Sequence, residues 1–219
     1  MALGFNFSDG GSGGEIIPII KFDCRSGRMF RRDRVNGEDN VVDISRSFKA
    51  VFDFENIEVG YINFDTGSAP DFQVVRFGEK QPDRPSEKHK PGVRLLVKLS
   101  KELGGDLREL ASTARAFLRG IDELHSAYAA GSAANPGKLP VVALKDTVAI
   151  VSGEGAKKST NYSPVFEIVG WVARPADLVY KPKNGVRAVA APVSSGGPPS
   201  TGSTQVSAPA PVSDAEDFG

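Results

Sequence analysis

The chain of 219 residues carries 27 Lys and Arg against 27 Asp and Glu, and 40% of its residues are hydrophobic, which is typical of a globular protein. One cysteine and two histidines exclude a disulfide scaffold and argue against a metal centre, so we predict no metal and no other cofactor. No apolar run approaches the roughly 18 residues of a membrane helix, and the first residues lack a secretory pattern. We therefore expect a cytoplasmic protein without membrane association.

The first part of the chain predicts a flexible start followed by strands. Glycine and serine are frequent in residues 1–14, which favours a flexible segment. Segments rich in β-forming residues, separated by turn residues and by a charged loop at 79–92, follow in this order: 15–22, 27–33, 47–54, 56–64, 72–78 and 93–99. Clean alternation in the third of them predicts one buried face made of Phe48, Ala50, Phe52 and Phe54.

One segment has helical periodicity. Asp106 and Glu109 have the spacing of a capping box, and apolar residues then recur every three or four positions. We predict one long helix over 106–130 that packs an apolar stripe on the strands, made of Leu107, Leu110, Phe117, Ile121 and Leu124. Gly120 within this pattern indicates a close contact with a strand.

Strands are predicted again after the helix. They cover 139–144 and 147–151, joined by a tight turn at Lys145 and Asp146, and then 164–174. The last segment is mostly apolar, which is typical of a strand covered on both faces. Together these elements predict a mainly β fold with one long helix, best described as an elaborated OB-like barrel over residues 15–180.

The composition changes at residue 181. Of the 26 residues from 188 to 213, 21 are Ala, Pro, Ser, Gly or Thr and none is charged, so residues 181–219 are predicted to be a disordered tail. The tail ends in a short acidic tip that contains one aromatic residue, with the side chains Asp214, Glu216, Asp217 and Phe218.

Basic residues gather in two stretches, 21–34 and 76–101, which predicts an anion-binding patch, although a solvated face is the simpler alternative. Alternation in 27–33 places Arg28, Phe30 and Arg32 on one face, and a buried face would not hold two arginines beside a phenylalanine. Single-stranded nucleic acid is bound by cations along the backbone and by aromatic rings that stack on bases. The candidate nucleic-acid contacts are Arg25, Arg28, Phe30, Arg31, Arg32, Arg34, Tyr61, Arg76, Phe77, Lys88, Lys90, Arg94, Lys98, Lys157, Lys158 and Tyr162.

Arg94 and Lys98 are candidates because of their positions in the predicted strand 93–99. They alternate with apolar residues in 93–99, which predicts a basic outer face over an apolar inner face. Lys157 and Lys158 are candidates because they lie in a predicted loop, SGEGAKKSTN, that could contact phosphates. That loop is not a phosphate-binding loop of the G-x-x-x-x-G-K-[ST] type, since the pattern fails at Lys158.

An OB-like body, an uncharged linker and a short acidic tip with a phenylalanine near its end resemble the single-stranded DNA-binding proteins of bacteria and T7-like phages. The resemblance concerns the layout and the tail. It implies that the body coats and protects single-stranded DNA, and that the tip at Asp214, Glu216, Asp217 and Phe218 contacts replication or recombination proteins. The chain departs from the bacterial family in having Gly219 after the phenylalanine and in its short acidic run.

Two other functions are compatible with parts of the sequence. A β-rich structural or adaptor protein would use the same cations to bind an acidic protein partner. An enzyme has less support, because His89 lies in a charged loop and His125 on the predicted helix, where we expect a packed or surface histidine rather than a member of a catalytic triad. We therefore predict a protein that is not an enzyme and that binds single-stranded DNA with little sequence preference.

Overall fold

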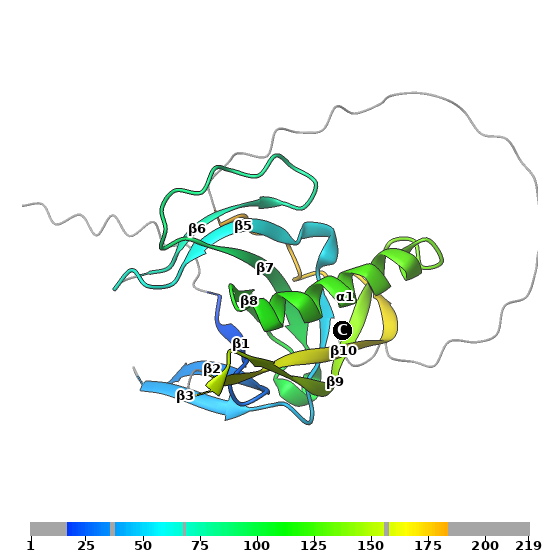
Figure 1. The fold of residues 1–219 in the computed structure, drawn as a ribbon. Helices are drawn as coiled ribbons and strands as arrows, with labels where there is room; N and C mark the ends of the chain where they lie inside the picture. The colour runs from blue at the N-terminus through cyan, green and yellow to red at the C-terminus, as the bar shows by residue number, and fades with distance from the viewer. Residues whose placement is uncertain (1–16, 36–37, 68, 156–157, 184–219) are drawn as a thin grey trace, which may run out of the picture.

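The computed structural model describes residues 17–35, 38–67, 69–155 and 158–183, which form a curled β-sheet and one α-helix (Figure 1). The predicted flexible start and acidic tip lie outside these residues. The predicted disordered tail, 181–219, begins too early, because Lys181 and Lys183 contact Arg94 and Glu109 of the sheet; its remainder lies outside the described residues. The elements are, in chain order, β1 (Ile19–Asp23), β2 (Arg28–Val35), β3 (Glu38–Asp43), β4 (Lys49–Phe52), β5 (Glu58–Asn63), β6 (Asp71–Arg76), β7 (Lys90–Leu99), β8 (Leu107–Ser112), α1 (Arg115–Ser132), β9 (Lys138–Ser152) and β10 (Ser159–Ala173).

The sheet has the strand order β10-β9-β4-β7-β8-β1-β2-β3, and β5 pairs with both β6 and the first half of β7. Neighbouring strands are antiparallel except β1 and β8, which are parallel. The sheet curls so that Tyr162 on β10 donates its backbone N–H to the carbonyl of Cys24, beyond β1, at 2.6 Å. The mainly β fold with one helix is confirmed, whereas the OB-like barrel is not, because the sheet stays open.

The main core lies between the concave face of the sheet and α1. Phe48, Ala50, Phe52 and Phe54 are all buried in it, as the alternation in 47–54 predicted. The helix contributes its own apolar side chains to the same core, namely Phe117, Ile121 and Leu124. A second, smaller apolar cluster lies on the outer face of the central strands, so β7 is buried on both sides: Val51, Leu96, Leu139, Val141, Val172 and Leu178.

The predicted start of the helix is wrong. Residues Leu107–Ser112 form β8, which pairs with β7 on one side and β1 on the other, and α1 begins only at Arg115. The capping box at Asp106 and Glu109 is therefore also wrong. Because β8 is largely buried on both of its faces, its residues show no period-two alternation, and tertiary pairing decides its structure.

Two predictions about the last strands are also wrong. Lys145 and Asp146 do not make a turn, because β9 continues through them and Lys145 is an extra residue opposite Val165 and Phe166 of β10. Nor is β10 covered on both faces. It is the last strand of the sheet, and Val169 on it is 43% exposed.

Gly120 makes the close contact with a strand that the sequence indicated. A Cβ atom at this position would lie 2.5 Å from the carbonyl oxygen of Pro164 on β10, which is too short for any real contact. The absence of a side chain therefore allows α1 to pack directly on the backbone of β10.

We predict that Gly120→Ala destabilises the protein although alanine is the better helix former by about 1 kcal/mol. The clash with the Pro164 carbonyl forces the helix and strand apart, and such overpacking costs about 1–3 kcal/mol. The melting temperature should fall by a few degrees in a thermal scan. Ser126→Ala on the exposed side of the same helix is the control and should leave it nearly unchanged; equal melting temperatures for the two variants would contradict the packing.

Candidate nucleic-acid interface

The outer face of strands β1, β2 and β3 carries the predicted cation and aromatic side chains. Arg28, Phe30 and Arg32 alternate along β2 with residues of the opposite face, and Phe30 is half-buried. The strand register places Lys21 of β1 and Asp43 of β3 on either side of Phe30. A ring edged by cations on a solvent-facing sheet is a suitable platform for a flat, anionic ligand.

Apolar side chains extend this face. Ile19 and Val41 flank Arg32 in the next row of the register, and Val41 is 51% exposed. Together with Lys21 they were missed as site residues. The signal for Lys21 was present, since it alternates with the buried Ile20 and Phe22, but the pairing of β1 with β2 could not be deduced from the sequence.

The arginines of this face form ion pairs at the surface. Arg28 lies 2.7 Å from Asp43, and Arg32 lies 2.9 Å from Asp39. Hydrogen bonds from the hydroxyl and amide of Ser45, and then the one from Arg28, hold the pKa of Asp43 below its usual value. Exposed ion pairs of this kind contribute at most about 1 kcal/mol, so a phosphate can replace the carboxylate as the partner of either arginine.

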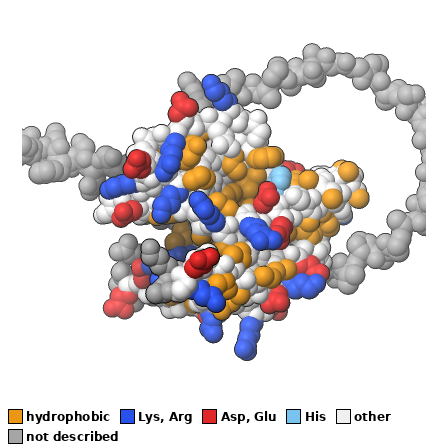
Figure 2. Space-filling view, in the orientation of Figure 1, with side chains coloured by type: hydrophobic (Ala, Val, Ile, Leu, Met, Phe, Trp, Pro, Cys, Tyr) orange, Lys and Arg blue, Asp and Glu red, His pale blue; other side chains and the backbone are white. Residues whose placement is uncertain are grey.

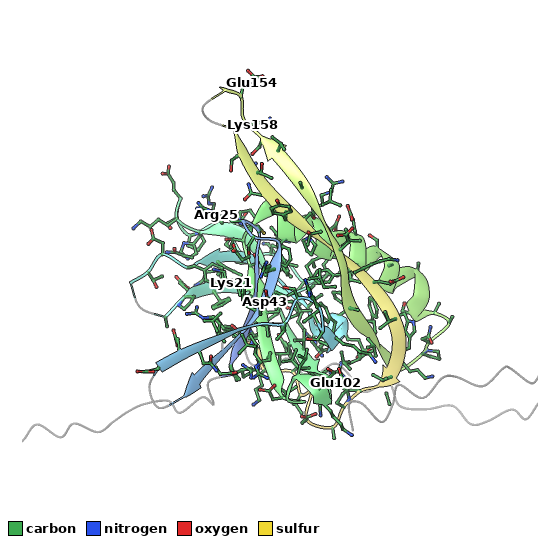
Figure 3. The ribbon with its side chains drawn as sticks, turned by 90° about the horizontal axis from the view of Figure 1, so that it is seen from below. Lys21, Arg25, Asp43, Glu102, Glu154 and Lys158 are labelled. Atoms are coloured by element: carbon green, nitrogen blue, oxygen red, sulfur yellow. The ribbon has the colours of Figure 1, made fainter. Side chains whose placement is uncertain are left out.

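Lys21 and Arg25 are exposed, and within the part of the chain that the structure describes no ion pair engages either side chain. Arg25 lies in the turn between β1 and β2, where Gly27 packs under the ring of Tyr162 on β10. Figure 3 shows this turn below the projecting end of the β9–β10 hairpin, which carries Lys158. Lys157 lies outside the described residues.

Arg31 belongs to the other side of β2 and does not share the surface of Phe30. It donates to the carbonyl of Leu103 at 2.6 Å. Beside it, the buried guanidinium of Arg108 on β8 lies 2.6 Å from Asp33 and 2.5 Å from Asp106. These contacts join the inner side of β2 to β8 and to Leu103, and so fix the position of the outer face of β2. The side chain of Arg34 lies outside the described residues.

A second group of predicted contacts lies on the β5–β6 hairpin and β7, away from β1–β3 (Figure 1). Arg76 pairs with Glu79 at 3.0 Å, and Phe77 is 63% exposed with its ring 4.9 Å from that of His125. Tyr61 on β5 is half-buried. Lys88 and Lys90 are exposed and lie near the start of β6, at the end away from Arg76. Figure 2 shows Lys and Arg side chains on both sides of a hollow between this hairpin and strands β1–β3.

The prediction that Arg94 lies on an exposed basic face is wrong. Arg94 is 2% exposed, and its guanidinium contacts the carboxylates of Glu58 on β5 and Glu109 on β8, the latter at 2.8 Å. Although burial disfavours its charge, Glu109 and Glu58 hold the pKa of Arg94 above its usual value. A phosphate cannot reach it without breaking this cluster.

Lys98 is also engaged, because the segment 174–183, which we name the strap, crosses the outer face of the central strands. Lys98 pairs with Asp177 of the strap at 2.9 Å, and Leu178 is buried in the second apolar cluster. The strap ends on the Arg94 cluster, where Tyr180 donates to Glu58 at 2.9 Å. Burial and that hydrogen bond raise the pKa of Tyr180 well above its usual value.

We predict that Arg94→Met lowers the free energy of unfolding by about 3–5 kcal/mol, because it leaves buried Glu58 without a cation and buried Glu109 with Lys183 alone. Adding Glu58→Gln and Glu109→Gln to the same chain should recover part of the loss. Urea denaturation of the variants measures both effects. Arg28→Met, which breaks an exposed pair, is the control and should cost less than about 1 kcal/mol; an equal loss for the two single variants would show that Arg94 is not the buried centre.

His89 has partners that the sequence did not reveal. Its Nε2 lies 3.0 Å from Asp71, and its Nδ1 lies 2.8 Å from the hydroxyl of Ser86. The three side-chain types are those of a catalytic triad. Here, however, Ser86 and His89 also close a backbone turn at 3.1 Å, and Arg84 donates to three carbonyls of the same loop. The cluster therefore folds the loop before β7.

No protein-family model matches this chain, and no curated protein or solved structure is significantly similar to it. In the described ranges, His, Cys, Asp and Glu side chains do not gather into a group that could hold a metal ion. The single α-helix of the described residues, α1, is not long and apolar enough to cross a membrane. The geometry of the outer face of β1–β3 is therefore the basis for a functional proposal.

Proposed function

We propose that the protein binds single-stranded DNA without strong sequence preference, through the outer face of β1–β3. The observation that carries the proposal is Phe30, which lies between Arg28 and Arg32 along β2 and beside Lys21 across the sheet. Base stacking on an aromatic ring is tolerant of sequence, and the cations bind the phosphates on either side. Such binding protects an exposed strand during replication or recombination.

The surroundings of this face support the proposal. The strap covers the outer side of the central strands, and β1–β3 lie beyond it and stay open to a ligand. Arg25 lies on the β1–β2 turn at the end of this face, and Lys158 lies farther out on the projecting β9–β10 hairpin, so both extend the positive charge beyond the sheet. Duplex DNA presents no unstacked bases, so the ring of Phe30 favours single strands.

We further propose that the acidic tip, Asp214 to Phe218, competes with DNA for these cations and contacts replication or recombination proteins. A flexible linker as long as the 26 uncharged residues before the tip would span roughly 28 Å on average, enough to return to the body. A phenylalanine among carboxylates suits a partner pocket with an apolar floor and a basic rim.

Replacing Phe30 by Ala should weaken binding to oligo-dT by about 1–3 kcal/mol if the ring stacks on a base. Fluorescence anisotropy at low salt measures the change. Phe64→Ala is the matched control, since Phe64 is an exposed ring beyond the end of β5, away from β1–β3. Equal affinities for Phe30→Ala and the original protein, at unchanged melting temperature, would refute the site.

The salt dependence of the affinity for oligo-dT distinguishes a DNA-binding protein from a protein-binding adaptor. Counterion release predicts that the affinity for oligo-dT falls steeply as salt rises. Equal affinity for single-stranded and duplex DNA, or no binding at low salt, would refute the proposal. The second result would favour an adaptor that uses the same face to bind an acidic protein.

Deleting residues 213–219 should raise the affinity for oligo-dT, and the gain should be largest at low salt, where screening is weakest. The triple variant Asp214→Asn, Glu216→Gln, Asp217→Asn should reproduce the gain, whereas Phe218→Ala should not. An affinity that is unchanged at low salt in the deleted chain would remove the competition from the account.

A further inference from the structure

A groove of about 400 Å³ runs between α1 and β10. Its floor is apolar, with Leu124 from the helix and Phe166, Ile168 and Trp171 from the strand. The helix lines it with the small residues Gly120, Ala127 and Gly131, and the two glycines let α1 contact Pro164 and Trp171 of β10 closely. Figure 2 shows hydrophobic side chains gathered over this part of the molecule, on the right of the view.

One side of the groove is the edge of a sheet. β10 is the last strand in the order, and among the described residues its outer edge pairs with no further strand. A sheet edge beside an apolar groove accepts an extended segment, which adds backbone hydrogen bonds to the strand and inserts alternate side chains into the groove. The groove therefore has the form of a site for strand addition along Val165–Ile168.

Residues 3–8 of this chain have the sequence such a site requires. Leu3, Phe5 and Phe7 alternate with Gly4, Asn6 and Ser8, so an extended segment would present three apolar side chains on one face. The first eight residues have no charged side chain and so bring no carboxylate to a rim that includes Glu123 and Glu167. The same rim disfavours the acidic tip of the tail.

The point at which the described chain begins makes the contact reachable. Ile17 packs against the second apolar cluster, which includes Val172 of β10, the residue after Trp171 on the other face of that strand. Between Ser8 and Ile17 lie eight residues, mostly Gly and Ser. A segment of this composition has an average span of roughly 15 Å and at full extension reaches about 27 Å.

We propose that residues 3–8 add to the free edge of β10 in the same molecule and fill the groove with Leu3, Phe5 and Phe7. The segment then covers the apolar floor and protects the sheet edge from pairing with other chains. This contact is separate from the DNA-binding face and is tested without DNA.

Trp171 is the only tryptophan of the chain and lines the groove, so its fluorescence reports the contact directly. Deleting residues 2–9 should shift its emission to longer wavelength and increase its quenching by acrylamide. Hydrogen exchange at Val165–Ile168 should become faster. Phe5→Ser with Phe7→Ser should reproduce these changes, whereas Asn6→Ser with Ser8→Ala, on the other face of the segment, should not.

Filling the groove from the helix provides a second test. Ala127→Gln should displace the segment and give the same red shift, while Ala130→Gln on the same helix, outside the groove, is the control. Unchanged emission and exchange after the deletion would overturn the proposal. A contact that weakens on dilution would also overturn it, because it would assign the segment to a second copy of the chain.

Discussion

The buried guanidinium of Arg94 is the constraint on which the arrangement of the sheet depends. It lies on β7 between Glu58 of β5 and Glu109 of β8, so one cation joins three strands. Charges removed from water are tolerated only when each has its partners. The three strands must therefore meet in this register, and the β5–β6 hairpin is held to the rest of the sheet.

The same cluster determines where a ligand can bind. The strap supplies its remaining contacts, with the hydroxyl of Tyr180, the carbonyl of Lys181 and the ammonium of Lys183. Because the strap must cross the central strands to reach Arg94, it covers their outer face. Strands β1–β3 lie beyond it, so their cations and Phe30 stay accessible. The structure thus separates Arg94 and Arg108, whose buried guanidinium groups join strands, from Arg28 and Arg32, which lie on the outer face of β2.

The alternation of apolar and polar residues within a single strand predicted which of its side chains share a face. The buried phenylalanines of 47–54 and the shared face of Arg28, Phe30 and Arg32 were found because each strand has two different faces. β8 was mistaken for helix because it is buried on both faces. The true role of Arg94 was hidden because its carboxylate partners lie 36 and 15 residues away in the chain. The groove between α1 and β10 likewise exists only in three dimensions.

Photo-cross-linking tests the central claim most directly. The full chain is irradiated with an oligo-dT that carries 5-iododeoxyuridine, and the linked residues are located by mass spectrometry. We expect cross-links on β1–β3, with Phe30 foremost, and their loss when unlabelled oligo-dT is added in excess. Cross-links confined to the β5–β6 hairpin around Phe77, or none at all under conditions of full binding, would contradict it.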